Sequence, residues 1–185
     1  PYDWSRGPLV DIPRNKRLVL VTAHRRESFG EPLHNICLAI RELAGMSQQM
    51  DIHFIYPVHL NPNVQHPVKD ILTNVDGISL IEPLDYLSLV HLLKHTELIL
   101  TDSGGIQEEA PTLGVPVLIL RELTERPEGI DAGVSMIVGT DKNNIIDKTW
   151  QILTTPSLHK AMSTRINPYG DGKSAIRIVR SLLEF

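Results

Sequence analysis

The sequence has few of the features that mark several protein classes. Its one cysteine, Cys37, cannot form an internal disulfide, and its place in an apolar helical pattern indicates a buried structural thiol. No apolar run approaches the roughly 18 residues that a membrane-spanning helix needs, and no signal peptide is visible. The 22 acidic residues outnumber the 18 basic ones, which disfavours a nucleic-acid partner. We expect a cytoplasmic protein that binds neither membranes nor nucleic acids.

The length and the apolar content allow one large domain or two small ones. The chain has 185 residues, of which 42% are hydrophobic, enough to bury a sizeable core. Its first residues, PYDWSRGPLVDIP, contain no initiator Met and are rich in proline and polar groups. We predict that residues 1–15 form a linker or interdomain segment and that residues 16–185 form one domain. We also expect the chain to be the second half of a longer protein.

Strand-like and helix-like segments alternate along the chain and are joined by short loops. Runs rich in β-branched residues and Leu predict strands at 16–22, 51–58, 78–81, 97–101, 116–120 and 134–138. Helical spacing of apolar residues predicts helices at 33–44, 64–75 (with Pro67 in the first turn), 86–93, 105–113 (closed by Gly114), 141–153 and 174–183. Parallel strands need helical crossovers, so this pattern predicts a Rossmann-like α/β fold with a doubly wound parallel sheet. Ligands in such sheets bind at the carboxyl ends of the strands.

The loop after the first predicted strand carries the cluster HRRE at residues 24–27. Guanidinium groups match the oxygens of a phosphate in pairs, so this cluster could meet an anion. A solvated charged turn is the alternative. The loop after the second strand, PVHLNP at residues 57–62, places His59 between prolines that stiffen the turn. His53 and His66 lie nearby, but no cysteine or paired carboxylate completes a tetrahedral set, so we expect no metal.

The segment DSGGIQEEA at residues 102–110 follows the fourth predicted strand and opens a helix. The backbone amides of a helix's first turn have no partner within the helix and carry partial positive charge. The two glycines would let a phosphate approach these amides closely, and Ser103 could add a hydroxyl donor. A carboxylate one turn further on could accept hydrogen bonds from ribose hydroxyls. The alternative is an ordinary Ser–Gly loop before an acidic first turn.

Two further segments concern phosphate binding. RELTERPE at residues 121–128 brings Arg121 and Arg126 to the same edge, where an arginine could bind a diphosphate or both could form surface ion pairs with the interleaved glutamates. GDGKS at residues 170–174 resembles the end of a P-loop. However, Asn167 stands where that motif needs its first glycine, and the residues upstream have helical and turn character instead of forming a buried strand. We therefore reject an ATPase.

The motifs HRRESFG, PVHLNP, DSGGIQEEA, LRELTERPE and NPYGDGKSA occur in this order. From about residue 18 to the end, they resemble the C-terminal half of non-hydrolysing UDP-N-acetylglucosamine 2-epimerases. The resemblance implies one half of a glycosyltransferase-B-type fold, in which two Rossmann-like domains enclose the active site. Residues 16–185 would then be the C-terminal UDP-binding domain. The acidic catalytic residues belong to the family's other domain, which lies outside this sequence.

The resemblance also implies roles for individual residues. It places a catalytic His24 at the pyrophosphate of the substrate, with the diphosphate on Ser103, Gly104 and Gly105, the ribose hydroxyls on Glu109 and a phosphate on Arg126. It assigns Arg25 and His59 to a second, regulatory UDP-N-acetylglucosamine molecule. Leu89 stands where relatives often have an aromatic residue near the uracil, and Leu84 stands where some have Gln. Contacts to the base are therefore left open.

The reaction implied by the resemblance interconverts UDP-N-acetylglucosamine and UDP-N-acetylmannosamine by elimination and re-addition of UDP. We expect it to need no cofactor, to serve cell-surface polysaccharide biosynthesis and to take place in a homodimer. The chain alone is expected to bind UDP weakly and to lack turnover. Two alternatives are a domain of a UDP-sugar glycosyltransferase and a non-catalytic module that binds nucleotide sugars.

Overall fold

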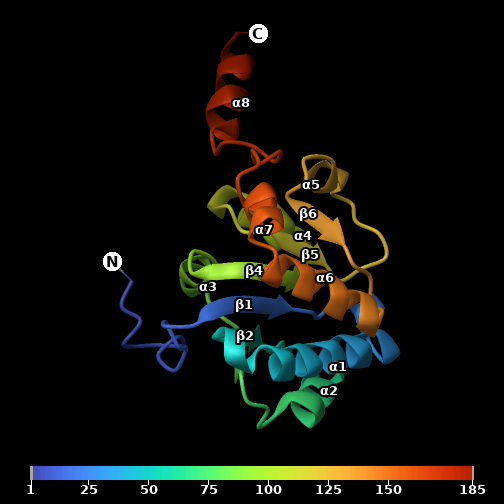
Figure 1. The fold of residues 1–185 in the computed structure, drawn as a ribbon. Coiled ribbons are helices and arrows are strands. Elements are labelled where there is room, and N and C mark those ends of the chain that lie inside the picture. Colours follow the sequence, from blue (N-terminus) through green and yellow to red (C-terminus); the bar gives the residue numbers. More distant parts are fainter. Residues whose placement is uncertain (1, 185) are drawn as a thin grey trace.

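The computed structural model describes residues 2–184 and contains one parallel sheet of six strands (Figure 1). The strands are β1 (Arg17–Thr22), β2 (Ile52–Pro57), β3 (Ile78–Ile81), β4 (Thr96–Thr101), β5 (Val117–Ile119) and β6 (Ser135–Ile137). Their order in the sheet is β3-β2-β1-β4-β5-β6, and every neighbouring pair is parallel. The predicted doubly wound sheet is confirmed. The strand order reverses between β1 and β4, so a ligand crevice is expected there.

Residues 2–184 contain eight α-helices, of which all but the last connect or cover the strands. They are α1 (Glu31–Met46), α2 (Pro62–Leu72), α3 (Tyr86–Leu93), α4 (Gly104–Glu109), α5 (Pro127–Asp131), α6 (Lys142–Thr154), α7 (Pro156–Ser163) and α8 (Ser174–Leu183). Short 3₁₀ helices occupy η1 (Arg26–Ser28), η2 (Gln48–Met50) and η3 (Ala110–Leu113). α7 and a turn, with no buried strand, precede the GDGKS segment, as the rejection of a P-loop requires.

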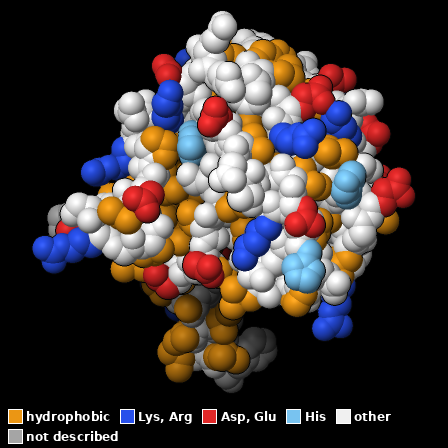
Figure 2. Space-filling model, turned by 90° about the horizontal axis from the view of Figure 1, so that it is seen from below, with side chains coloured by type: hydrophobic (Ala, Val, Ile, Leu, Met, Phe, Trp, Pro, Cys, Tyr) orange, Lys and Arg blue, Asp and Glu red, His pale blue; other side chains and the backbone are white. Residues whose placement is uncertain are grey.

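The last helix, α8, extends away from the body of the domain (Figure 1). Its apolar side chains are more than half exposed; they are Ile176, Ile178, Val179, Leu182 and Leu183. None of the helices in the described part of the chain is both long enough and apolar enough to cross a membrane. On the face shown in Figure 2, basic, acidic and histidine side chains are interspersed, and none of the three kinds gathers into a large patch.

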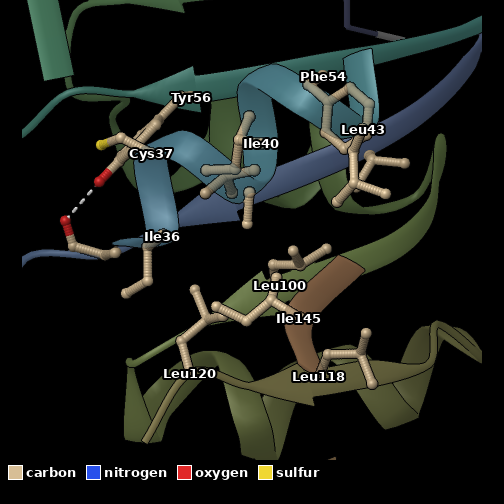
Figure 3. Packing of buried hydrophobic residues seen from close by; sticks show 14 of the residues in the cluster. Ile36, Cys37, Ile40, Leu43, Phe54, Tyr56, Leu100, Leu118, Leu120 and Ile145 are labelled. Carbon is tan, nitrogen blue, oxygen red and sulfur yellow. Dashed lines mark hydrogen bonds between the residues drawn. The ribbon is translucent and has the colours of Figure 1, made fainter. Parts of the chain in front are cut away.

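Two apolar clusters hold the sheet between layers of helices. Side chains alternate along β1, so that Val19 and Val21 belong to one cluster while Leu18 and Leu20 belong to the other. The first cluster joins the sheet to α1, α2 and α6, and Figure 3 shows part of it. The second joins the opposite face to α3 and α4. The continuous apolar runs of the strands thus reflect burial on both faces, as predicted.

Cys37 lies in the first cluster beside Tyr56 (Figure 3). The cysteine is fully buried, and burial raises the pKa of its thiol to about 12. The Tyr56 hydroxyl donates a hydrogen bond to the carbonyl oxygen of Ala23, 2.7 Å away, so that its polar atom is satisfied inside the core. The prediction of a buried structural thiol is confirmed.

Residues 2–15 pack against the domain. Trp4, Leu9 and Ile12 are buried in the second cluster, and the Tyr2 ring stacks on His91 with 4.5 Å between ring centroids. The Tyr2 hydroxyl also lies 2.7 Å from the Ser88 hydroxyl. The segment is therefore anchored to α3, and its assignment as a linker stays a prediction.

Three details of the predicted elements were wrong. α2 begins at Pro62, where the Asn61 side chain caps it, so Pro67 lies in the second turn instead of the first. The helix predicted at 105–113 is regular only to Glu109 and continues as 3₁₀, because Pro111 has no N–H to donate. Gly114, with φ 69°, closes it as predicted. The short helix α5, which follows the RELTER segment, was not predicted at all.

Candidate functional site

A cavity of about 290 Å³ lies where the chain leaves β1, β2 and β4. Its lining residues are Thr22, His24, Pro57, His59, Pro83, Leu84, Leu89, Ser103, Gly105, Ile106 and Glu109. The lining comes from both sides of the point where the strand order reverses, the usual place for a ligand in such a sheet. A larger cavity of about 350 Å³, beside Glu27 and Arg121, contains none of the residues that the resemblance assigns to a ligand.

The head of α4 forms the polar side of the cavity. The Ser103 amide donates to the Thr101 hydroxyl at 2.9 Å, so this amide is engaged by the protein itself. The Ser103 side chain makes no capping bond, and among residues 2–184 no hydrogen bond leaves the amides of Gly104, Gly105 or Ile106. A Cβ added at Gly105 would meet nothing within 4 Å. An anion can therefore approach this turn closely and bind its amides.

Gly104 makes room for Arg126. A Cβ at Gly104 would lie 2.7 Å from the central guanidinium carbon of Arg126, so the guanidinium rests on the backbone of the glycine. Nε of Arg126 donates to Oε1 of Glu108 at 2.5 Å, and its Nη1 lies 3.6 Å from Oε2 of Glu125. Arg126 thus stands at the head of α4, as a phosphate contact requires, and is also held in the ion pairs that the sequence offered as the alternative.

Arg121 has a structural arrangement. Its guanidinium binds Oε1 of Glu27 through Nε at 2.5 Å and both carboxylate oxygens of Glu125 at 2.7 and 2.9 Å. The hydrogen bonds from Arg121 lower the pKa of Glu125 to about 2. Thr124 donates to the side-chain carbonyl of Gln107 at 2.7 Å. These contacts tie the loop after β5 to the loop after β1 and to α4, and they support the ion-pair interpretation for Arg121.

Asp102 was not singled out from the sequence, yet it joins the two loops that carry most of the site. It is fully buried, and its Oδ2 accepts the backbone amides of His24 and Arg25 at 2.8 and 2.7 Å. The His24 Nδ1 lies 3.6 Å from the other oxygen, Oδ1. The only sequence feature that could have identified Asp102 was its position directly after a buried strand, with no basic residue next to it to pair with its carboxylate.

The structure brings His24 and His59 together but separates Arg25 from them. The two imidazole rings stack, with centroids 5.3 Å apart and planes within 5°. The Asn61 amide donates to Nδ1 of His59 at 3.1 Å. The Arg25 guanidinium is directed toward Glu125, 3.8 Å away, and does not line the cavity. The two residues assigned to a regulatory ligand therefore do not share this cavity.

Apolar side chains make up much of the remaining lining. They are Pro83, Leu84, Leu89 and Ile106, and the partly exposed Glu109 completes the lining. Amides on one side and an apolar wall on the other suit a ligand with an anionic group and a flat ring. At about 290 Å³ the cavity is small beside typical ligand pockets of roughly 300–1,000 Å³.

Within residues 2–184, no three His, Cys, Asp or Glu side chains are grouped so that they could hold a metal ion. His53 shares a hydrogen bond of 2.8 Å with Ser79, a contact between β2 and β3. His66 lies away from the cavity, beside Pro62 and Pro67.

A family model described as UDP-N-acetylglucosamine 2-epimerase matches residues 6–183. The chain belongs to the UDP-N-acetylglucosamine 2-epimerase family. The UDP-N-acetylglucosamine 2-epimerase of Salmonella typhimurium is 52% identical over 171 residues, which cover 92% of this chain and 45% of that protein. The chain therefore spans about half the length of the curated 2-epimerase relatives it matches.

Solved structures agree with this assignment. The crystal structure of a 2-epimerase from Neisseria meningitidis bound to UDP-GlcNAc matches with a TM-score of 0.89 and 46% identity. The match covers 94% of this chain and 46% of that chain. A glycosyltransferase of kitacinnamycin shares the fold, with a TM-score of 0.58 at 11% identity over 80% of this chain. The family and the fold class expected from the resemblance are confirmed.

Proposed function

We propose that this chain is the UDP-binding half of a UDP-N-acetylglucosamine 2-epimerase, which interconverts UDP-N-acetylglucosamine and UDP-N-acetylmannosamine. The observation that carries the proposal is that His24 lines one cavity with Gly105 and Ile106, whose amides are open, at the reversal of the strand order. Membership of the 2-epimerase family and a relative bound to UDP-GlcNAc support this ligand.

In this proposal the nucleotide lies across the head of α4. Its diphosphate accepts hydrogen bonds from the amides of Gly104 and Gly105, with the Ser103 hydroxyl and Arg126 at the edges. The Glu109 carboxylate accepts from the ribose hydroxyls, since it lines the same cavity five residues after Gly104. The uracil ring packs against the apolar wall that includes Leu84 and Leu89.

The proposed reaction begins with elimination. A base removes the proton from C2 of the sugar, the bond from C1 to the phosphate oxygen breaks, and UDP leaves with the electron pair as C1 and C2 become doubly bonded. The amides at the head of α4, together with His24 and Arg126, stabilise the charge that develops on UDP. An acid then returns a proton to the other face of C2, and the held UDP re-adds to C1. We assign the base and the acid to the half of the protein outside this sequence.

The full-length protein tests this proposal when it is incubated with UDP-N-acetylglucosamine and no acceptor in D₂O. We expect a second UDP-sugar with deuterium at C2, detected by NMR. A glycosyltransferase would give no second UDP-sugar without an acceptor. A non-catalytic module would bind the nucleotide sugar and leave it unchanged, and either outcome would refute the epimerase.

Calorimetric titration of this chain with UDP tests the individual contacts. Arg126→Ala is expected to weaken UDP binding about tenfold, the effect of losing one charged hydrogen bond. Glu109→Ala is expected to weaken UDP about as much and to leave a deoxyribose analogue unaffected. Glu42→Ala, a change on α1 far from the cavity, serves as control. If Glu109→Ala weakens the analogue as strongly as UDP, the ribose contact is wrong.

The proposal extends to a cytoplasmic homodimer that serves polysaccharide biosynthesis. Cys37, the single cysteine, is buried as a free thiol, which fits a reducing compartment. Light scattering on the full-length protein tests the dimer, and a monomeric mass with full epimerase activity would contradict it.

A further inference from the structure

The buried carboxylate of Asp102 has one oxygen atom that accepts no hydrogen bond from residues 2–184 of the protein. Oδ2 accepts the backbone amides of His24 and Arg25, and the Ser28 hydroxyl lies 3.5 Å from it. Oδ1 is also buried but has no hydrogen-bond partner among the described residues. A buried carboxylate oxygen without a donor is costly, so a native structure needs a reason to keep one.

His24 presents the donor nearest to this oxygen. Its Nδ1 lies 3.6 Å from Oδ1, just beyond hydrogen-bond distance, and its side chain is 40% exposed toward the cavity. The backbone amide of the same residue is already fixed to Oδ2 at 2.8 Å. A small rotation of the ring would bring Nδ1 into contact, and such contacts are often long before the ligand binds.

The neighbouring polar groups do not compete for Oδ1. The hydroxyls of Thr22 and Thr101 bind each other at 2.6 Å, and the Tyr56 hydroxyl is engaged with the carbonyl of Ala23. His59 stacks flat on the His24 ring and therefore restricts its tilt without approaching its edge. The contact from Asp102 to His24 is thus the one that the geometry favours.

We propose that Asp102 is a positioning residue, whose Oδ1 holds the His24 imidazole with its Nδ1–H directed inward, so that Nε2 faces the cavity. The proposal deepens the epimerase function above and rests on it, because it assigns Nε2 as the atom that meets the departing UDP. A carboxylate behind an imidazole fixes the orientation of the ring and stabilises its protonated, charged form, whose Nε2–H can then donate a hydrogen bond to the departing UDP.

The replacement Asp102→Asn separates positioning from a merely structural role. The amide carbonyl of Asn can still accept the two backbone N–H groups, so the loop keeps its anchor. Its NH₂ group then lies where Oδ1 stood and offers a donor to Nδ1 of His24. The neutral ring must respond by moving its proton to Nε2.

Long-range ¹H–¹⁵N NMR of the histidines in this chain reports the tautomer directly. We expect the neutral His24 ring to carry its proton on Nδ1 in the native chain and on Nε2 in Asp102→Asn. The spectrum of His24→Gln identifies the signals of this ring among the eight histidines. Asp141→Asn, the same change at the carboxylate that caps α6, is the matched control and should leave the His24 signals unchanged. A native ring protonated on Nε2, or the same tautomer in both chains, would overturn the proposal.

Kinetics of the full-length enzyme give the second readout. Asp102→Asn should lower kcat by about 100-fold, because the NH₂ group of Asn faces Nδ1 and disfavours the charged His24 ring that stabilises the departing UDP, with UDP affinity within about threefold of native. Equal losses in kcat and in UDP affinity would indicate a collapsed loop and count against positioning. If the native enzyme lacks epimerase activity, the proposed function fails, while the NMR experiment still decides how Asp102 acts on His24.

Discussion

The heads of α6 and α4 follow β6 and β4, two parallel strands of one sheet with β5 between them, and are built in opposite ways. At α6, the Asp141 carboxylate accepts the Asn144 amide at 2.8 Å and so caps its own helix. At α4, neither Asp102 nor Ser103 caps the helix that follows. α2 and α3 resemble α6, because Asn61 and Asp85 cap them. The sequences around the two heads are DKNN and DSGG: the carboxylate is at the N-cap of α6 but one residue before the N-cap of α4, and only that of α6 caps its own helix.

The difference lies in where the polar groups are directed. The Asp102 carboxylate accepts amides of the loop after β1, and the Thr101 hydroxyl accepts the Ser103 amide. Asp102 and Thr101 therefore leave the next amides of α4 without a partner among residues 2–184, although both residues precede that helix directly. A missing cap costs a helix about 1 kcal/mol. α1, α5, α7 and α8 also lack side-chain caps. The first three have a proline in their first two positions, which removes one donor, and α8 is exposed, so that water can bind its amides. α4 has no such proline and keeps its donors facing a cavity.

A side chain that fills the open turn of α4 should give the largest difference between the loss of UDP affinity and the loss of stability. Gly105→Val places a side chain where the phosphate would lie, and nothing in the protein stands within 4 Å of its Cβ. We expect UDP affinity, measured by calorimetry, to fall about 100-fold through the loss of charged hydrogen bonds. The melting temperature should stay close to native.

Gly45→Val is the control for this change. Gly45 is an exposed glycine in α1, where an added Cβ also meets nothing within 4 Å, so it carries the same helix penalty away from the cavity. Native UDP affinity in Gly105→Val would show that the amides of α4 do not receive the phosphate.

Alanine at the two N-cap positions should give opposite results. Asp141→Ala removes a capping bond and should lower the free energy of unfolding by about 1 kcal/mol, with UDP affinity unchanged. Ser103→Ala removes no capping bond, so its stability should lie within about 0.5 kcal/mol of native. The lost hydroxyl should weaken UDP about three- to tenfold. Urea unfolding and calorimetry on both variants decide the matter, and equal destabilisation of the two would mean that Ser103 is a structural cap after all.

The sequence predicted the parts of this contrast that depend on local pattern. The two-sided apolar runs of the strands identified a parallel sheet, and a parallel sheet gathers its carboxyl ends at one edge. His24, His59 and Gly105, which the sequence put at the ends of strands, accordingly line one cavity. The caps of α2 and α6 are also local, since Asn61 and Asp141 accept amides two and three residues further on, but they were not among the predictions.

The rest depends on contacts between segments far apart in the chain. Asp102 binds amides 77 and 78 residues away, and Arg126 rests on Gly104, the first residue of α4. Neither the periodicity of apolar residues nor the spacing of a motif indicates which residues far apart in the chain will form such contacts. The rotation of Arg25 toward Glu125 is also set by a neighbouring loop, which is why its assignment beside His59 could not be judged from the sequence.

The smallest effect should come from the acidic partners of Arg126. Arg121 holds Glu125 through two hydrogen bonds, so Glu108, whose side chain is 44% exposed, is the partner that can release Arg126. Glu108→Gln removes a negative charge beside the open turn of α4 and weakens the hold on the guanidinium. We expect UDP affinity to rise about two- to fivefold, since an exposed ion pair contributes only about 0.2–1 kcal/mol. The gain should shrink in 0.5 M salt, because screening at roughly that ionic strength reduces both the repulsion and the ion pair. A loss of UDP affinity in calorimetry would show instead that Glu108 positions Arg126 for the phosphate. The ion pair between Glu108 and Arg126 would then be part of the binding site, instead of competing with the phosphate for Arg126.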